Sequence, residues 1–246
     1  MTAAMQTWFW LGALGTLVGA LYFGLGAYSA RKVGDTRAEI LYQLTFFVSV
    51  LAAVLYLGLA SGYGAIEAGE GPGTRTVWLR HVVWLFSSPL LITILIYLGR
   101  TRLTTATALL GSSVLGVVTA FLATIAADSS KFTFFFLWLG AVVALAYLLL
   151  RPYRQEVSAA YPNRAGSFTL LIGAYVVIWA LYPVVWLLSP EGWGWVGSTM
   201  EVSLFMTLDL LAIVGFGLLA GSTHAQLSGG EPIQPGKLLR SEAPHS

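Results

Sequence analysis

Residues 166–188 read GSFTLLIGAYVVIWALYPVVWLL and contain no charged side chain. A helix of about 20 apolar residues crosses the hydrocarbon core of a bilayer, so this stretch predicts a transmembrane helix. The same criterion applied outward from it predicts seven spans in all: residues 7–29, 40–62, 78–99, 104–126, 132–151, 166–188 and 197–221. The sequence therefore predicts an all-α integral membrane protein whose residues 1–221 form one seven-transmembrane-helix bundle.

The composition agrees with this fold class and excludes several kinds of function. Hydrophobic residues make up 57% of the 246-residue chain and charged residues only 10%, with a mean hydropathy of +0.77. A soluble protein needs about 25% charged residues, so we expect a multi-pass protein of the plasma membrane. A net charge of +2 without basic runs gives no reason to expect nucleic acid binding. The chain has no cysteine, its three histidines are far apart, and no nucleophile–base pair is evident, so we expect neither a metal site nor an enzyme.

Positive charge predicts the orientation of the bundle. If the seven spans alternate, one side holds ten of the cations: Arg31, Lys32, Arg37, Arg100, Arg102, Arg151, Arg154, Arg164, Lys237 and Arg240. Cytoplasmic loops are enriched in Lys and Arg, so the N-terminus is predicted outside and the C-terminus in the cytoplasm. Tryptophans favour membrane interfaces, and the predicted outer interface receives Trp8, Trp10, Trp78, Trp193 and Trp195. Residues 222–246, rich in Gly, Pro and Ser, are predicted to be a polar, disordered cytoplasmic tail.

Few ionisable residues fall within the predicted spans, and each is a candidate for a functional role. Asp209 lies deep in the last span, whereas Arg80 begins the third. An isolated carboxylate at that depth is costly, so we expect Asp209 to face Arg80 across the bundle, directly or through water. This pair either locks the two helices together or also tunes a ligand site.

Three segments carry a resemblance to a known family. They are residues 80–91, RHVVWLFSSPLL, residues 179–187, WALYPVVWL, and residues 204–217, LFMTLDLLAIVGFG. In order and spacing they resemble the microbial (type 1) rhodopsins, above all bacteriorhodopsin and its haloarchaeal relatives, over about residues 7–221. The resemblance implies a helix bundle around a retinal held covalently by a lysine of the last helix.

The resemblance also implies which residues line the pocket. Trp84 and Trp179 correspond to the aromatics that sandwich the retinal, and Trp179, Tyr182 and Trp186 share one helix face. The full set of pocket positions is Trp84, Ser88, Leu91, Gly116, Trp138, Leu145, Trp179, Tyr182, Trp186 and Ile213. Tyr56 and Tyr182 match the two tyrosines that hold the aspartate of the last helix, so the implied buried charge network is Arg80, Asp209, Tyr56 and Tyr182. Glu191 and Glu201 match an outer carboxylate pair, which we interpret as solvated.

The chain departs from the family at the residues that do its chemistry. Ile213 stands where the family has its retinal-bearing lysine, four residues after Asp209. The only lysines, Lys32, Lys131 and Lys237, fall at loops, a helix end or the tail. A Schiff base needs a primary amine, so we expect no covalent retinal and, as the remaining cofactor option, a non-covalent retinal or retinoid.

The proton-transfer positions of the pumps are changed as well. The proton acceptor, its neighbour and the proton donor are replaced by Val83, Ser87 and Ile94. Neither Val83 nor Ile94 carries a proton, so a light-driven proton pump is not expected. The buried charges that remain, Arg80 and Asp209, sum to zero. A lysine returned to position 213 is then predicted to give an unprotonated Schiff base that absorbs in the near ultraviolet.

Three functions stay open from the sequence. The first is a photoreceptor-like protein that binds retinal or a similar apolar ligand without a covalent bond. The second is a lysine-less structural partner that forms a homo-oligomer or assembles with another, functional rhodopsin. The third is an ion channel or transporter that works without light, although no ring of acidic residues supports it.

Overall fold

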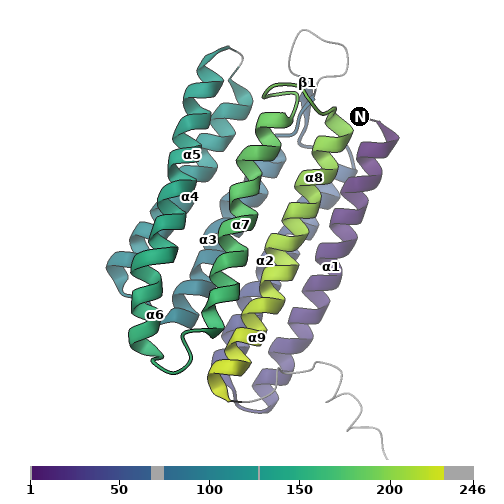
Figure 1. Ribbon diagram of the computed structural model, residues 1–246. Coiled ribbons are helices and arrows are strands. Elements are labelled where there is room, and N and C mark those ends of the chain that lie inside the picture. The colour runs from purple at the N-terminus through teal and green to yellow at the C-terminus, as the bar shows by residue number, and fades with distance from the viewer. Residues whose placement is uncertain (1, 68–74, 127, 230–246) are drawn as a thin grey trace, which may run out of the picture.

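A computed structural model describes residues 2–67, 75–126 and 128–229. Its described helices form seven long rods that are apolar enough to cross a membrane, as predicted (Figure 1). Four are single helices near the start of the chain: α1 (Ala3–Lys32), α2 (Thr36–Ala60), α3 (Leu79–Gly99) and α4 (Leu103–Ile125). The fifth runs from α5 (Ser130–Leu148) through the π-helical turn η1 (Leu149–Tyr153) into α6 (Arg154–Ala160). The sixth is α7 (Ser167–Leu188), and the seventh joins α8 (Ser198–Leu210), η2 (Leu211–Gly215) and α9 (Phe216–Ser228).

The only described strands lie in the connection between α2 and α3. There β1 (Ile66–Glu67) pairs antiparallel with β2 (Arg75–Thr76), at the end of the bundle that carries the N-terminus (Figure 1). The fold is thus the predicted helical bundle with one small hairpin added at its end.

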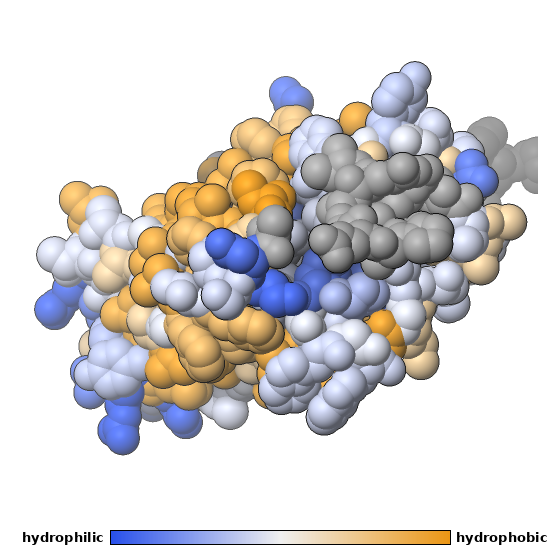
Figure 2. All heavy atoms as spheres, turned by 90° about the horizontal axis from the view of Figure 1, so that it is seen from above, coloured by the Kyte–Doolittle hydropathy of each residue, from blue (hydrophilic) through white to orange (hydrophobic). Residues whose placement is uncertain are grey.

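The outer surface of the rods is apolar. Leu14 and Leu21 on α1 are 58% and 62% exposed, and Phe136 and Val143 on α5 are 65% and 61% exposed. Seen from the N-terminal end, hydrophobic residues gather along the outer flank, while hydrophilic residues lie near the middle of the end face (Figure 2). An apolar surface of this extent is stable in lipid and not in water, so the chain is a multi-pass membrane protein.

Small residues let the helices approach where the interior is crowded. A Cβ added at Gly12 of α1 would lie 2.8 Å from the ring of Tyr56 on α2. One added at Gly217 of α9 would lie 2.3 Å from Thr45 on α2. Glycine at these two positions therefore allows α1 and α9 to close onto α2, and Gly12 gives the Tyr56 ring its place in the bundle.

The last helix is longer than the sequence predicted. It ends at Ser228 rather than at residue 221, so the predicted boundary of the polar tail was wrong. Thr223 and His224 are buried, and the Nε2 atom of His224 lies 2.9 Å from a carboxylate oxygen of Asp35 in the turn between α1 and α2. Polarity marked the end of the membrane span, but contacts with the neighbouring turn continue the helix beyond it. Residues 230–246, the rest of the predicted tail, lie outside the described residues.

We expect Asp35→Ala to lower the thermal unfolding temperature. Asp35 caps α2 by accepting the Ala38 N–H at 2.9 Å, and it is also the partner of His224. Loss of an N-cap costs about 1 kcal/mol, or about 2–4 °C in a protein of this size. The control is Glu39→Ala, because the side-chain bond of that carboxylate within the described residues is an exposed one from Gln43. Equal shifts in the two variants would contradict the role of Asp35.

The effect of Asp35 should depend on pH. Burial raises the pKa of its carboxyl, but the hydrogen bonds from His224 and from the Ala38 N–H outweigh burial and hold the pKa below 3.8. The folded state therefore binds this proton less tightly than the unfolded state does. The stabilisation is complete above about pH 3.8 and is lost as the pH falls through the lower folded pKa. Unfolding temperatures of the wild type and Asp35→Ala, measured against pH, should converge in that acidic range.

Candidate functional site

The carboxylate of Asp209 is enclosed by three hydrogen-bond donors from three helices. Tyr182 of α7 donates to Oδ1 at 2.6 Å, Trp84 of α3 donates its indole N–H to the same oxygen at 2.8 Å, and Tyr56 of α2 donates to Oδ2. Asp209 is 1% exposed, and all three donors are buried. The two tyrosines hold Asp209 as predicted. The bond from Trp84 was not predicted, because the resemblance implied only a wall of the pocket for that residue.

Arg80 pairs with Glu201 instead of Asp209. Its Nη1 atom lies 2.7 Å from Oε1 of Glu201, both side chains are buried, and the guanidinium lies 4.1 Å from the centroid of the Phe205 ring. Of the two forms predicted for the pair of Arg80 and Asp209, the direct contact is absent among the described residues, and the contact through water stays a prediction. The interpretation of Glu201 as a solvated carboxylate was wrong. The reason is depth: Arg80 lies in the first turn of α3 and Glu201 in the first turn of α8. Asp209 lies eight residues further along that helix, about 12 Å deeper at 1.5 Å per residue.

Glu191, the other predicted outer carboxylate, has a local role. One of its carboxylate oxygens accepts the hydroxyl of Ser189 at 2.8 Å, and its backbone carbonyl accepts Lys131 Nζ at 2.7 Å. It is half-buried in the connection between α7 and α8. These bonds tie that connection to the start of α5 and do not join Glu191 directly to Glu201.

The predicted aromatic residues form a continuous wall through the bundle. Tyr182 connects two of its tryptophans, since the Trp84 ring meets it edge-on at 4.8 Å between centroids and Trp179 stacks on it at 5.0 Å. Further along, Trp186 stacks on Phe135 at 5.1 Å. Trp138 lies 6.5 Å from Trp84 and 6.4 Å from Trp186. All four tryptophans are buried, so the inferred pocket walls do gather in the interior.

A small polar chain supports the outer part of this wall. Trp186 donates its indole N–H to the hydroxyl of Thr124 at 3.0 Å, and that hydroxyl lies 3.2 Å from Nε2 of His81. Sequence reasoning missed Thr124, and it noted His81 only as an ionisable residue near the start of the third span, without a partner. One signal was present, because His81 follows Arg80 directly and a polar pair at the start of an apolar helix needs buried partners.

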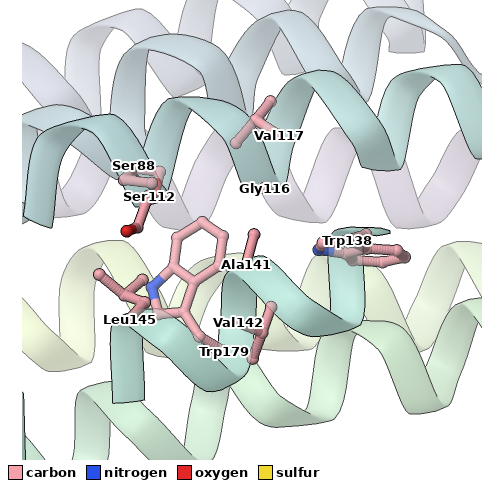
Figure 3. A pocket seen from close by; sticks show the side chains of 10 residues that line it. Ser88, Ser112, Gly116, Val117, Trp138, Ala141, Val142, Leu145 and Trp179 are labelled. Atoms are coloured by element: carbon pink, nitrogen blue, oxygen red, sulfur yellow. Dashed lines mark hydrogen bonds between the residues drawn. The ribbon is translucent and has the colours of Figure 1, made fainter. Parts of the chain in front are cut away.

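A narrow cavity remains beside Trp179, with a volume of about 10 Å³. Its lining is Ser88, Ser112, Ser113, Gly116, Val117, Trp138, Ala141, Val142, Leu145 and Trp179. Figure 3 shows the Trp179 indole close to Ala141 and Leu145, with only backbone at Gly116 on the opposite wall. A second cavity of about 10 Å³ adjoins it and is bordered by Tyr175 and Trp179. Ligand pockets usually measure about 300–1,000 Å³, so a ligand enters only if these side chains move.

Five predicted pocket residues border the first cavity and five do not. Those that border it are Ser88, Gly116, Trp138, Leu145 and Trp179. Those that are buried outside its lining are Trp84, Leu91, Tyr182, Trp186 and Ile213. In the second group, Trp84 and Tyr182 bond Asp209, and Trp186 bonds Thr124. The cavity therefore occupies only the part of the predicted pocket that lies between α3, α4, α5 and α7.

Two hydrogen-bond donors beside the cavities have no partner. The indole N–H of Trp179 is buried without an acceptor among the described residues, and the buried hydroxyl of Tyr175 has no acceptor within 3.5 Å there, with Ser88 as its polar neighbour. Nearby, the hydroxyls of Ser88 and Ser113 bond each other at 2.5 Å. An unsatisfied buried donor costs about 1–3 kcal/mol, so these atoms favour a water or a ligand oxygen next to them. Tyr175 was missed, although it precedes Trp179 by four residues and therefore shares its helix face.

Ile213, which the resemblance places at the lysine position, lies in an irregular turn. Ile213 is 1% exposed and sits within η2, the π-helical turn between α8 and α9. π-Helical turns are rare in proteins overall, but many of those that occur lie at functional sites. Val83, Ser87 and Ile94, which the resemblance places at the proton-transfer positions, are buried on α3. Within the described ranges, no cluster of three or more His, Asp or Glu side chains is arranged to hold a metal ion.

Comparison with known proteins gives consistent similarities over nearly the whole chain. Residues 3–227 match the sequence model of the family described as bacteriorhodopsin-like proteins. The chain is 34% identical to bacteriorhodopsin of Haloterrigena sp. (strain arg-4) over 216 residues, covering 86% of this chain and 85% of that protein. It is also 34% identical to cruxrhodopsin-3 of Haloarcula vallismortis over 232 residues, covering 90% and 91%. Among solved structures, thermophilic rhodopsin from Rubrobacter xylanophilus superposes with a TM-score of 0.81 at 31% identity, covering 91% of this chain and 97% of that one.

Proposed function

The chain belongs to the bacteriorhodopsin-like protein family, and from this premise we propose that it binds retinal or a similar slender apolar ligand without a covalent bond. Members of the family bind retinal, and the aromatic wall around this interior is the surface that such a ligand contacts. The observation that carries the proposal is Ile213, which is buried at the position of the lysine without a replacement amine. The wall persists while the group for covalent attachment is gone.

The two unpartnered donors support a ligand with a polar end. An aldehyde, hydroxyl or carboxylate oxygen next to the cavities would accept bonds from the Trp179 indole and the Tyr175 hydroxyl, neither of which has an acceptor within 3.5 Å in the described part of the chain. A purely apolar ligand would leave both donors unsatisfied. We therefore favour retinal and retinoids over hydrocarbons.

Light-driven proton pumping is not part of the proposal. Pumping requires a group near the chromophore that takes a proton and another that returns it. Val83 and Ile94 stand at those positions and are buried hydrocarbon side chains. Asp209 already accepts three hydrogen bonds. We therefore assign it a structural role and not that of a proton acceptor.

A structural partner subunit is the second candidate, and the size of the cavities favours it. Each measures about 10 Å³, which is room for about one water molecule. A bundle packed this closely needs no ligand to be stable, and its apolar flanks are available to a second membrane protein. A channel or transporter without light has less support, because the Arg80–Glu201 pair and the aromatic wall fill the interior.

The two candidates differ in their response to all-trans retinal. Under the proposal, added retinal quenches the tryptophan fluorescence of the purified protein in a saturable manner. The retinal is then recovered unchanged by solvent extraction, and borohydride leaves no adduct in the mass spectrum. If tryptophan quenching does not saturate as the retinal concentration rises, the result favours the partner subunit.

Filling the cavity should weaken ligand binding. Gly116 faces the cavity, and a Cβ there would meet Ala141 at 3.6 Å, so Gly116→Leu places the rest of a leucine in the remaining space. Gly111→Leu is the matched control, because Gly111 is exposed on the same helix with nothing within 4 Å of an added Cβ. We expect retinal affinity to fall about tenfold or more in Gly116→Leu, since overpacking costs about 1–3 kcal/mol. The same affinity in both variants would contradict the assignment of the pocket.

A further inference from the structure

A third and larger hollow lies at the bundle end where α2 begins and α3 ends. It measures about 560 Å³ and is lined by Thr36, Arg37, Ile96, Tyr97, Arg100 and Thr101. We call it the basic groove. Arg100 follows the last residue of α3, and Thr36 is the first residue of α2. The groove thus opens at the surface of the bundle, far along the helices from the Arg80–Glu201 pair.

Arg37 is held so that part of its guanidinium stays available. Its Nη2 atom donates to the carbonyl of Leu98 at 2.8 Å and to the hydroxyl of Tyr161 at 2.6 Å. The first contact fixes the guanidinium against α3, and the second fixes it against the loop after α6. Its remaining N–H groups have no acceptor within the described part of the chain, so they can bond a ligand without first losing a protein contact.

Arg100 occupies a position that favours glycine. It is the only described residue other than glycine with a positive φ, with φ 53° and ψ 44° at the C-terminal end of α3. Helices commonly end with glycine in this left-handed conformation, because a Cβ raises the backbone free energy there. The guanidinium of Arg100 lies 5.6 Å from the centroid of the Tyr161 ring. An arginine at a strained position suggests that its side chain has a use.

The groove combines uncompensated positive charge with polar and apolar walls. Among the described residues, no carboxylate lies within ion-pair distance of Arg37 or Arg100. The hydroxyl of Thr101 is buried without a hydrogen-bond partner. Ile96 and Tyr97 are half-buried and add an apolar wall. These features describe a site for an anion that is attached to an apolar body.

We propose that the basic groove binds the phosphate group of an anionic membrane lipid. Two arginines offer forked N–H donors that match phosphate oxygens, and the Thr101 hydroxyl supplies another donor. The groove lies at the end of membrane-spanning helices, where lipid headgroups are found, and basic pockets between such helices bind anionic headgroups. A free phosphate ion shares this chemistry but has no apolar part that could contact Ile96 and Tyr97. The lipid is therefore the source that the groove fits better.

The test uses the full chain purified in detergent and three probes. Phosphatidylglycerol and phosphatidylcholine with identical acyl chains are titrated and counted on the protein by native mass spectrometry, and inorganic phosphate is the third probe. The variant is Arg100→Gly, which removes the charge and relaxes the strained backbone. Arg102→Gln is the matched control, because Arg102 is exposed two residues away and does not line the groove.

We expect the wild type to retain phosphatidylglycerol in preference to phosphatidylcholine. Arg100→Gly should weaken phosphatidylglycerol binding by about tenfold or more, the effect of one charge-assisted hydrogen bond. Arg102→Gln should weaken it by about threefold or less, because an exposed charge outside the site is screened. The unfolding temperature of Arg100→Gly without lipid should be unchanged or higher, since glycine relieves the strain.

Three results would overturn the proposal. Both lipids carry a phosphodiester, and only in phosphatidylcholine does a cationic choline neutralise it. Equal retention of the two lipids would therefore show that the net negative charge of the headgroup is not recognised. Equal weakening by Arg100→Gly and Arg102→Gln would assign the effect to diffuse surface charge. Saturable binding of inorganic phosphate that needs Arg100, without preference for phosphatidylglycerol, would assign the groove to a soluble phosphate compound instead of a lipid.

Discussion

Ile213→Lys should give the protein a covalent retinal and a visible absorption band. The new side chain lies four residues after Asp209 and therefore shares its helix face, so the amine is placed next to a buried carboxylate. Because Glu201 bonds Arg80 directly, the negative charge of Asp209 remains available to a protonated Schiff base. A protonated Schiff base absorbs in the visible, an unprotonated one in the near ultraviolet. We expect a visible band at neutral pH, measured by absorbance after addition of all-trans retinal.

This expectation reverses the one drawn from the sequence alone. There, Arg80 was assigned to Asp209, which left no counterion for a Schiff base. The buried charges of the structure are instead Arg80 with Glu201, plus Asp209 enclosed by neutral donors. A lysine-linked Schiff base makes that set neutral, and neutral sets avoid the cost of a buried unpaired charge.

The control is Ile213→Arg, which brings a positive charge but no primary amine. It should form no borohydride-stable adduct and no visible band. A near-ultraviolet band in Ile213→Lys that moves to the visible only when Val83→Asp is added would show that Arg80 still governs the site. Failure of Ile213→Lys to bind any retinal would mean that the side chains around Trp179 do not open, and the partner-subunit function would gain support.

The seven helices and two of the hydrogen-bond donors to Asp209 could be predicted from the sequence. Seven apolar segments predict seven spans because a bilayer sets one length for all of them. Tyr56 and Tyr182 were assigned to Asp209 through matched motifs that keep their spacing to the helices around them. Both predictions depend on the spacing of residues along a helix, which can be counted in the sequence.

Contacts between helices were harder to predict, because they depend on how far each helix is shifted along its neighbour and on how the side chains pack. The choice between Asp209 and Glu201 as the partner of Arg80 required knowing how far α3 and α8 are shifted along each other. The small size of the cavity beside Trp179 depends on how the rings of four tryptophans settle together. The last turns of α9 contact residues far away in the sequence: His224 bonds Asp35, and Arg164 donates to the carbonyls of Gln226 and Leu227. None of these follows from hydrophobic periodicity.

Arg80→Gln should be among the most destabilising single substitutions in the chain. It leaves Glu201, which is 2% exposed, without its cation. Removing one partner of a buried ion pair costs about 3–5 kcal/mol, which corresponds to a fall of about 10 °C in the unfolding temperature for a protein of this size. The measurement is thermal unfolding in detergent, and Arg154→Gln serves as the control because Arg154 is exposed.

The double variant Arg80→Gln/Glu201→Gln separates the ion pair from the space that its side chains fill. Two amides of nearly unchanged size bond each other without a buried charge, so most of the lost stability should return. Asp209→Asn should behave differently when added to Arg80→Gln. Asp209 accepts bonds from Tyr56, Tyr182 and Trp84, and an asparagine presents an NH₂ group to donors that need an acceptor. Arg80→Gln/Asp209→Asn should therefore be less stable than Arg80→Gln alone. The opposite order, in which Asp209→Asn restores stability and Glu201→Gln does not, would make Asp209 the electrostatic partner of Arg80 after all.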